Sequence, residues 1–197
     1  MAKDLRAGQS AKRCGVNVRE KSFVRIFRRF ITIGLLASVV FAVRTEAQQA
    51  RTIYLVRHAD KVSDDVDAPL SDAGRKRAEC LANTLADAQV QQIFTSDLQR
   101  TQQTAAPLAE KLHLKPAAIP ISKPDELIDA IRSSQAASVL VVWHDATLPK
   151  ILRALGAPEI TPIAHTEYDR FFVVTLTGDG KESKPGFAAL RYCDCPK

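Results

Sequence analysis

The sequence predicts an α/β fold, a three-layer α/β/α sandwich with a mainly parallel sheet of about six strands. Beyond residue 47, short apolar runs alternate with segments of helical periodicity, as they do in α/β domains. The run SVLVVW over residues 138–143 has no polar alternation, which is typical of a central parallel strand buried on both faces. The 197 residues are 46% hydrophobic and 25% charged, a composition that argues against disorder, collagen and a polytopic membrane protein.

Strands are expected where apolar, β-branched and aromatic residues form short runs. In chain order, they are expected over residues 52–57, 92–95, 117–121, 138–143, 171–176 and 187–192. The last two are joined by a predicted turn at residues 178–180, with the sequence GDG.

The first two helices are predicted from a capping residue followed by apolar residues at helical spacing. Ser71 is placed to cap the first helix, whose apolar stripe consists of Ala78, Leu81, Ala82 and Leu85. Asp97 is placed to cap the second, whose stripe consists of Thr101, Ala105, Leu108 and Leu112. Each stripe is expected to face the sheet.

Two further helices follow in the second half of the chain. One begins near Pro124. The other begins at Thr147, has Pro149 in its first turn and ends before Gly156, because Pro favours the start of a helix and Gly the position after its end.

The first 47 residues are expected to be an export signal that is removed, leaving a single catalytic domain over residues 48–197. Basic residues precede an apolar run over residues 30–43, and Thr45 and Ala47 are small residues before a cleavage site. The run has 14 residues, fewer than the roughly 20 that span a bilayer. We therefore expect a periplasmic or secreted protein, with an uncleaved membrane anchor as the alternative.

The same segment holds all of the excess positive charge. Residues 1–47 contain ten Lys or Arg against three Asp or Glu, and residues 48–197 contain eighteen against nineteen. The net charge of +6 therefore divides into +7 and −1. A domain without a basic excess has no general attraction for a phosphate backbone, so nucleic-acid binding is not expected.

Three cysteines remain beyond the expected signal, in what would be an oxidising compartment. Cys193 and Cys195 are too close in sequence for a comfortable mutual bridge. Two interpretations stay open: a disulfide between Cys80 and one of them, or Cys80 as a small buried helix residue with both tail cysteines exposed.

Three polar clusters interrupt the pattern, each at the end of a predicted strand. They are Arg57 with His58, the segment 96–100, and His144 with Asp145. Ligands of open α/β sheets bind beyond the carboxyl ends of the strands, so we expect these clusters to converge. Two guanidinium groups with an imidazole form a compact cationic pocket suited to a phosphoryl dianion.

These residues lie in three motifs that together resemble the histidine phosphatase superfamily, also called phosphoglycerate mutase-like. The motifs are LVRHA over residues 55–59, TSDLQRT over 95–101 followed by QTA over 103–105, and VVWHDATLP over 141–149. They occur in the family's order, and the resemblance covers nearly all of residues 51–176. Two positions depart from the usual pattern, since Ala59 and Trp143 stand where the family commonly has glycine. We expect the Trp143 ring to pack against a neighbouring strand.

The resemblance implies that His58 attacks phosphorus and becomes a phosphohistidine. It further implies that Arg57, Arg100 and His144 bind the phosphoryl oxygens, without a metal or other cofactor, and Ser96 is expected to donate a hydrogen bond at the same site. His58 must present an unprotonated nitrogen, so its other nitrogen needs an acceptor such as a backbone carbonyl. His144 is expected to be the charged imidazole of the pair.

The donor of a proton to the leaving oxygen is open at this point. Asp145 is our choice, because the HD pair resembles that of the acid-phosphatase branch; the alternative is that it only caps a helix. Asp60, Asp64 and Asp65 are rivals in the loop after the first strand. His165 is expected to be structural, although it could also border the site.

The sequence thus predicts an exported, metal-independent phosphatase acting on a phosphomonoester. A non-catalytic phosphoryl-binding protein and a phosphomutase are the alternatives, and the short gaps between motifs leave no room for the lid that a mutase needs. The expected substrates are a phosphorylated small molecule, an envelope glycolipid or a phosphoprotein.

Overall fold

A computed structural model describes residues 50–177 and 185–193. Their strands are β1 (Arg51–Arg57), β2 (Gln92–Ser96), β3 (Ala117–Ile119), β4 (Ser138–Trp143), β5 (Arg170–Leu176) and β6 (Gly186–Arg191). Their helices are α2 (Asp72–Thr84), α3 (Gln99–Leu112), α4 (Pro124–Ser133) and α5 (Leu148–Ala154). All six expected strands are present, with ends shifted by a residue or two. The expected export signal over residues 1–47 and the turn over 178–180 lie outside the described residues.

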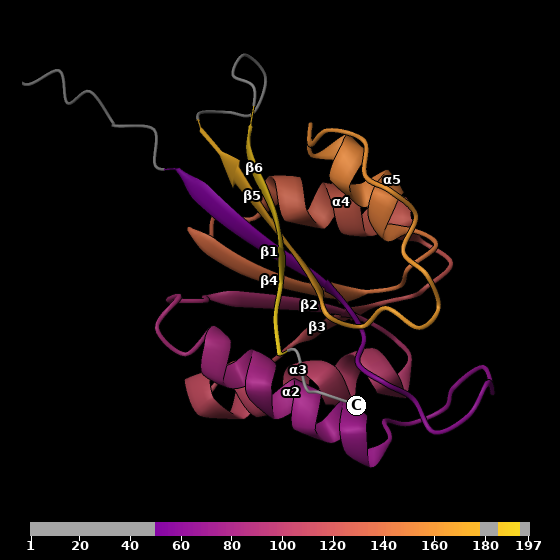
Figure 1. The fold of residues 1–197 in the computed structure, drawn as a ribbon. Coiled ribbons are helices and arrows are strands. Elements are labelled where there is room, and N and C mark those ends of the chain that lie inside the picture. Colours follow the sequence, from indigo (N-terminus) through magenta and orange to yellow (C-terminus); the bar gives the residue numbers. More distant parts are fainter. Residues whose placement is uncertain (1–49, 178–184, 194–197) are drawn as a thin grey trace, which may run out of the picture. The chain divides into compact units, whose positions relative to one another are not determined.

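The strands form one sheet in the order β3-β2-β4-β1-β5-β6 (Figure 1). The pairs β2/β3, β2/β4 and β1/β4 are parallel, while β1/β5 and β5/β6 are antiparallel. Every residue of β4 is buried, which confirms that the unalternated apolar run is a central strand. The prediction of a mainly parallel, six-stranded sheet is therefore confirmed.

Helices cover both faces of this sheet, as Figure 1 shows. Leu81 of α2 and Leu108 of α3 belong to one buried cluster, and Leu127 of α4 and Ile151 of α5 belong to the other. Strand residues alternate between the two clusters, as β-strand geometry requires. The three-layer α/β/α prediction is confirmed.

One of the two predicted helix caps is wrong. The Ser71 side chain accepts a hydrogen bond from the Gly74 N–H at 3.1 Å and caps α2 as expected. Asp97, however, does not cap α3, whose N-cap residue is Leu98 without a side-chain bond. The Asp97 carboxylate instead accepts the Ile121 N–H at 2.8 Å. The carboxylate that the local sequence assigned to the helix cap is thus bound to a backbone N–H from a distant segment.

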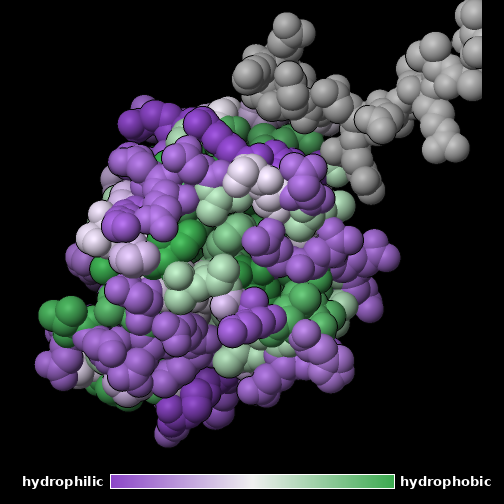
Figure 2. Space-filling view, turned by 180° about the vertical axis from the view of Figure 1, so that it is seen from behind, coloured by the Kyte–Doolittle hydropathy of each residue, from purple (hydrophilic) through white to green (hydrophobic). Residues whose placement is uncertain are grey.

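The surface of the described domain is mostly polar. Hydrophilic residues cover most of the face in Figure 2, and apolar residues show between them. The large hydrophobic side chains exposed among the described residues are Val62, Val66 and Leu190. Within residues 50–177 and 185–193, no helix is long and apolar enough to cross a membrane.

A disulfide joins Cys80 of α2 to Cys193, which follows β6. This settles the pairing in favour of one of the two interpretations, while Cys195 lies outside the described residues. Beside the bridge, Arg77 donates to the Cys193 carbonyl at 3.0 Å and to the Asp60 carboxylate at 2.7 Å. The end of the described chain is thereby tied to α2 and to the segment that follows β1.

The start of α2 packs closely against the backbone of Asp60. The Ser71 N–H donates to the Asp60 carbonyl at 2.9 Å, and a Cβ at Gly74 would lie 2.1 Å from the same oxygen. A side chain at position 74 would therefore have to displace backbone two residues from His58. Glycine is required here by the close approach, not by its dihedral angles.

We therefore expect Gly74→Ala to lower the free energy of unfolding by about 1 to 3 kcal/mol, the usual range for overpacking. Gly186→Ala is the matched control, because a Cβ there meets Thr175 at an ordinary 3.4 Å. Urea unfolding of both variants checks the prediction. Equal stability of the two variants would contradict it.

Candidate active site

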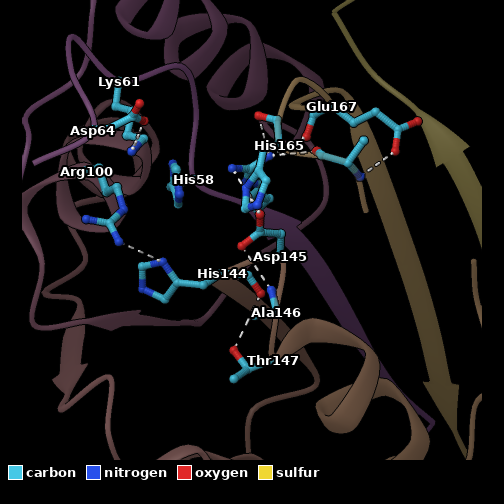
Figure 3. A network of polar contacts seen from close by, with 12 residues as sticks. His58, Lys61, Asp64, Arg100, His144, Asp145, Ala146, Thr147, His165 and Glu167 are labelled. Atoms are coloured by element: carbon cyan, nitrogen blue, oxygen red, sulfur yellow. Dashed lines mark hydrogen bonds and ion pairs between the residues drawn. The ribbon is translucent and has the colours of Figure 1, made fainter. Parts of the chain in front are cut away.

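The three polar clusters predicted from the sequence meet at one edge of the sheet (Figure 3). Arg57 ends β1 and Trp143 ends β4 in matching register, and the His58 N–H donates to the Trp143 carbonyl at 2.9 Å. His58 and His144 therefore leave adjacent parallel strands side by side, with ring centroids 5.3 Å apart. Arg100 reaches the same place from the first turn of α3.

A cavity of about 570 Å³ opens at this edge. Its lining residues are Arg57, His58, Lys61, Asp64, Arg100, Ile121, His144, Asp145, Ala146, His165 and Tyr168. The predicted set of two arginines, two histidines and Asp145 is thus brought together. Ser96, Asp60 and Asp65 do not belong to the lining.

His58 presents one free ring nitrogen to the cavity. Its Nδ1–H donates to the Ala59 carbonyl at 2.8 Å, so Nε2 is the unprotonated nitrogen of the neutral ring. Burial lowers the pKa of His58 to about 4; the Ala59 hydrogen bond opposes the shift, and the charges of Arg57 and Arg100 add to it. A backbone acceptor for Nδ1 is the arrangement expected from the sequence.

His144 is neutral in this structure, so the expectation that it is charged is wrong here. Arginine can only donate, so the contact of Arg100 Nη2 with His144 Nδ1 at 3.3 Å makes Nδ1 an acceptor. The proton lies on Nε2, which donates to Ser96 Oγ at 2.9 Å. Burial lowers the pKa of His144 to about 3, with His58, Arg100 and Arg57 adding to the effect.

Ser96 supports His144 from behind. It is fully buried, and its hydroxyl lies 2.9 Å from Thr101 Oγ1 as well as from His144 Nε2. Thr101 Oγ1 in turn lies 2.8 Å from the Leu98 carbonyl that accepts its proton. The chain of hydroxyl groups fixes the tautomer of His144, so Ser96 orients an imidazole where the sequence suggested a phosphate donor.

Arg57 is buried and holds the loop that leads into β5. Its Nη1 donates to the carbonyls of Ala164, His165 and Glu167 at 2.9, 2.9 and 3.1 Å. The guanidinium lies 4.4 Å from the centre of the Tyr168 ring, a cation–π contact. These contacts leave Nε without a hydrogen-bond partner.

Arg100 has a similar arrangement on the opposite side of the cavity. Its Nη1 donates to the Val66 carbonyl at 2.6 Å and its Nη2 to His144, while its buried Nε has no hydrogen-bond partner. Buried polar groups in proteins are nearly always paired. Both arginine residues line the same cavity, and two guanidinium groups at one cavity suit a bound oxyanion.

Asp145 is a cavity residue and not a helix cap. Helix α5 begins at Leu148 with Thr147 as its N-cap, whereas Asp145 Oδ1 accepts the N–H of its neighbour Ala146 at 2.9 Å. Asp145 Oδ2 lies 3.2 Å from Arg57 Nη2 and 2.9 Å from His165 Nδ1. The capping interpretation is therefore wrong.

The other carboxylates considered from the sequence have different partners. Asp60 pairs with Arg77, and Asp65 accepts from Ser63 Oγ at 2.8 Å. Asp64 borders the cavity but is exposed and pairs with Lys61 at 2.8 Å, a contact that lowers the Asp64 pKa. Of these rivals, only Asp64 lines the cavity.

Sequence reasoning missed part of the site. Tyr168, which no sequence pattern assigned to the site, lines the cavity against Arg57. His165 was expected to be structural, with the border of the site as the alternative, and the alternative holds, since it borders the cavity against Asp145. Both follow a loop without regular structure, and no local pattern indicates where such a loop folds. The expectation that Trp143 packs internally is confirmed, since its side chain is fully buried in the core.

Comparison with known proteins gives a family and a fold. A family model described as the histidine phosphatase superfamily (branch 1) matches residues 53–127, which include most of β1, all of β2 and the first two polar clusters. No curated protein sequence matches the chain.

Solved structures with the same fold have low sequence identity. The protein histidine phosphatase SixA in complex with tungstate is 24% identical, with a TM-score of 0.54, covering 71% of this chain and 96% of that one. A mycobacterial glucosyl-3-phosphoglycerate phosphatase is 15% identical, with a TM-score of 0.58 and coverage of 73% and 98%. An Entamoeba histolytica phosphoserine phosphatase is 13% identical, with a TM-score of 0.54 and coverage of 73% and 98%.

Because the pKa values of His58 and His144 are lowered, we expect the folded protein to lose stability in mild acid. Between pH 6.5 and about 4 the unfolded chain binds protons that folded His58 and His144 exclude, so the free energy of unfolding falls as pH falls. The expected slope is roughly 1.4 kcal/mol per pH unit for each histidine within this window. Urea unfolding between pH 6.5 and 5 measures it. His144→Asn should reduce the slope, and a flat wild-type profile would contradict the assignment.

Proposed function

The chain belongs to the histidine phosphatase superfamily, and from this membership we propose that it is a metal-independent phosphatase that hydrolyses a phosphomonoester through a phosphohistidine on His58. The family and fold themselves support a phosphatase or mutase-type function. The observation that carries the finer proposal is the state of His58, whose Nδ1 is held by a carbonyl and whose Nε2 lines a cationic cavity.

In the first proposed step, the substrate phosphoryl group binds between the two arginines. Their guanidinium groups, which both line the cavity, donate to phosphoryl oxygens and offset the charge of the transition state. The lone pair of His58 Nε2 attacks phosphorus, and the leaving oxygen departs on the opposite side. In the second step, water attacks the phosphohistidine and restores His58.

We propose that His144 gains a proton when substrate binds, rather than before. The charges of Arg57 and Arg100 help to lower its pKa in the free site. A phosphoryl dianion between these arginines offsets their charges and raises that pKa. Nδ1 then donates to the substrate in place of accepting from Arg100.

Hydrolysis is favoured over transfer to a second substrate by the openness of the site. The His165 side chain at the cavity edge is 94% exposed, so water reaches the intermediate. A mutase protects its phosphoenzyme from water, which requires a cover over the site.

The proposed substrates are a phosphorylated small molecule, an envelope glycolipid or a phosphoprotein. The neighbouring structures include a protein histidine phosphatase and phosphatases of small molecules, so likeness of fold spans both classes. Export remains our proposal from the N-terminal sequence and is supported by the Cys80–Cys193 disulfide, since such bridges persist in oxidising compartments. Screening phosphorylated metabolites, envelope glycolipids and phosphopeptides against the purified domain would rank the three classes.

We expect His58→Ala to abolish turnover and the acid-labile phosphoenzyme trapped by rapid quenching, because no second nucleophile is placed to replace Nε2. Release of product and ³²P labelling measure the two effects. The matched control is His113→Asn, at an exposed histidine in left-handed conformation after α3, which should keep both. More than a few per cent residual activity in His58→Ala would contradict the mechanism.

Lysine should replace neither arginine fully, because it cannot bind two oxygens with a planar fork. The two positions should differ in the effect of lysine on stability. Replacing either by Ala should cost roughly 2 to 4 kcal/mol of transition-state stabilisation, measured as kcat/KM, and Lys should restore only part of it. Arg57→Lys should also reduce stability towards urea, because three loop carbonyls lose their shared donor. Arg100→Lys, which loses one carbonyl contact, should unfold at nearly wild-type urea concentration. Full rescue by Lys at both positions would mean that only diffuse charge is needed.

A further inference from the structure

We propose that His165 donates the proton to the leaving oxygen and that Asp145 positions His165 for this task. The proposal rests on the proposed phosphatase function and identifies a catalytic group that the family motifs do not contain. It also changes the role of Asp145 from proton donor to positioning residue.

The Asp145 carboxylate is engaged at both of its oxygens. Its Oδ1 is engaged by the N–H of Ala146, and its Oδ2 is buried, near Arg57 Nη2 at 3.2 Å and His165 Nδ1 at 2.9 Å. A general acid must come within about 3 Å of the oxygen that it protonates. Asp145 Oδ2 does not meet this condition, because it is buried next to Arg57 and His165.

His165 has the access that Asp145 lacks. Its side chain is 94% exposed and lines the cavity, and Figure 3 shows its ring against Asp145. Because Nδ1 is turned to the carboxylate, Nε2 on the far side of the ring is available to substrate. The contact of Nδ1 with the carboxylate sets the orientation of the ring.

The backbone of His165 is fixed by a phosphate-binding residue. Arg57 donates to the carbonyls on both sides of the turn and to that of His165 itself. Within the turn, the Glu167 carboxylate accepts the Ala164 N–H at 3.0 Å, and the Glu167 N–H donates to the Ala164 carbonyl at 2.9 Å. The side chain is exposed, but the turn that carries it is held to the phosphoryl site.

The proposed proton transfers balance over the two steps. As the Nε2–P bond to His58 forms and the ester P–O bond breaks, the leaving oxygen takes the Nε2 proton of the His165 imidazolium. When water attacks phosphorus and the N–P bond breaks, His165 Nε2 takes a proton from that water and becomes imidazolium again. Phosphate and alcohol leave, and no further reactant is needed.

The test compares His165→Asn with His113→Asn, a histidine on the far end of α3 that the site does not use. A good leaving group departs without a proton, whereas a poor one needs it. We expect His165→Asn to slow phosphoenzyme formation from an alkyl phosphate by about 10²-fold or more, and to change the rate from an aryl phosphate by less than about threefold. His113→Asn should change neither rate.

Asp145→Asn separates the two possible donors. If Asp145 positions His165, this variant slows the alkyl phosphate less than His165→Asn does, and the double variant is no slower than His165→Asn alone. If Asp145 is the donor, Asp145→Asn has the larger effect and His165→Asn leaves the alkyl-to-aryl ratio near wild type. That second pattern would overturn the proposal.

The pH dependence gives an independent readout. The groups that face His165 are Asp145 and Arg57 from within the site and Asp64 from the loop after β1. We expect the pH dependence of the wild-type alkyl-to-aryl ratio to vanish in His165→Asn. A pH dependence of this ratio that persists in His165→Asn would overturn the assignment.

Failure of this proposal and failure of the proposed function give different results. Absence of any phosphoenzyme from the aryl phosphate in the wild-type chain would contradict the phosphatase mechanism itself. A normal phosphoenzyme with an unchanged alkyl-to-aryl ratio in His165→Asn would contradict only the role of His165.

Discussion

The site depends on the parallel pairing of β1 with β4. This pairing sets Arg57 opposite Trp143. The hydrogen bond from the His58 N–H to the Trp143 carbonyl continues the pairing one residue beyond the end of β1. The two histidines therefore leave the sheet together and in a fixed relation. Because β4 is buried on both faces, the register is secured by core packing on either side. Catalytic geometry is here a consequence of strand register.

The concentration of positive charge at this edge has to be stabilised before any substrate arrives. Arg57 is only 3% exposed, and it is compensated by three loop carbonyls, the face of Tyr168 and Asp145. Burial lowers the pKa values of the two imidazoles, the nearby positive charges add to the effect, and both rings are therefore neutral. The neutral state of His58 reduces the positive charge of the site. It also makes His58 a competent nucleophile for attack on phosphorus.

Local sequence patterns predicted those parts of the molecule that local interactions determine. The apolar run of β4, the Ser71 cap and the order of strands and helices follow from periodicity and capping chemistry. The positions of Arg57 and His144 followed from the rule that ligands bind at the carboxyl ends of parallel strands. That rule depends only on the order and direction of the strands, so it needs no knowledge of side-chain contacts.

Contacts between distant segments account for what sequence reasoning missed. Asp97 has the side chain of a helix cap but accepts the Ile121 N–H, a donor 24 residues further on. The turn at residues 164–167 is placed by Arg57, more than 100 residues earlier, so its His165 could not be assigned to the site. The neutral state of His144 before substrate binds was missed for a related reason, since it is set by burial and by His58 and Arg100 rather than by residue type.

The central claim is that His58 Nε2, with Nδ1 held by the Ala59 carbonyl, is the atom that forms a bond to phosphorus. The measurement that tests it most directly is the position of phosphorus on the phosphoenzyme, trapped from an aryl phosphate and digested at alkaline pH. Tandem mass spectrometry locates the modified residue, and ³¹P NMR distinguishes the two ring isomers. We expect a single phosphohistidine, on residue 58, with phosphorus on Nε2. Phosphorus on Nδ1, or on Ser, Asp or another histidine, would contradict it.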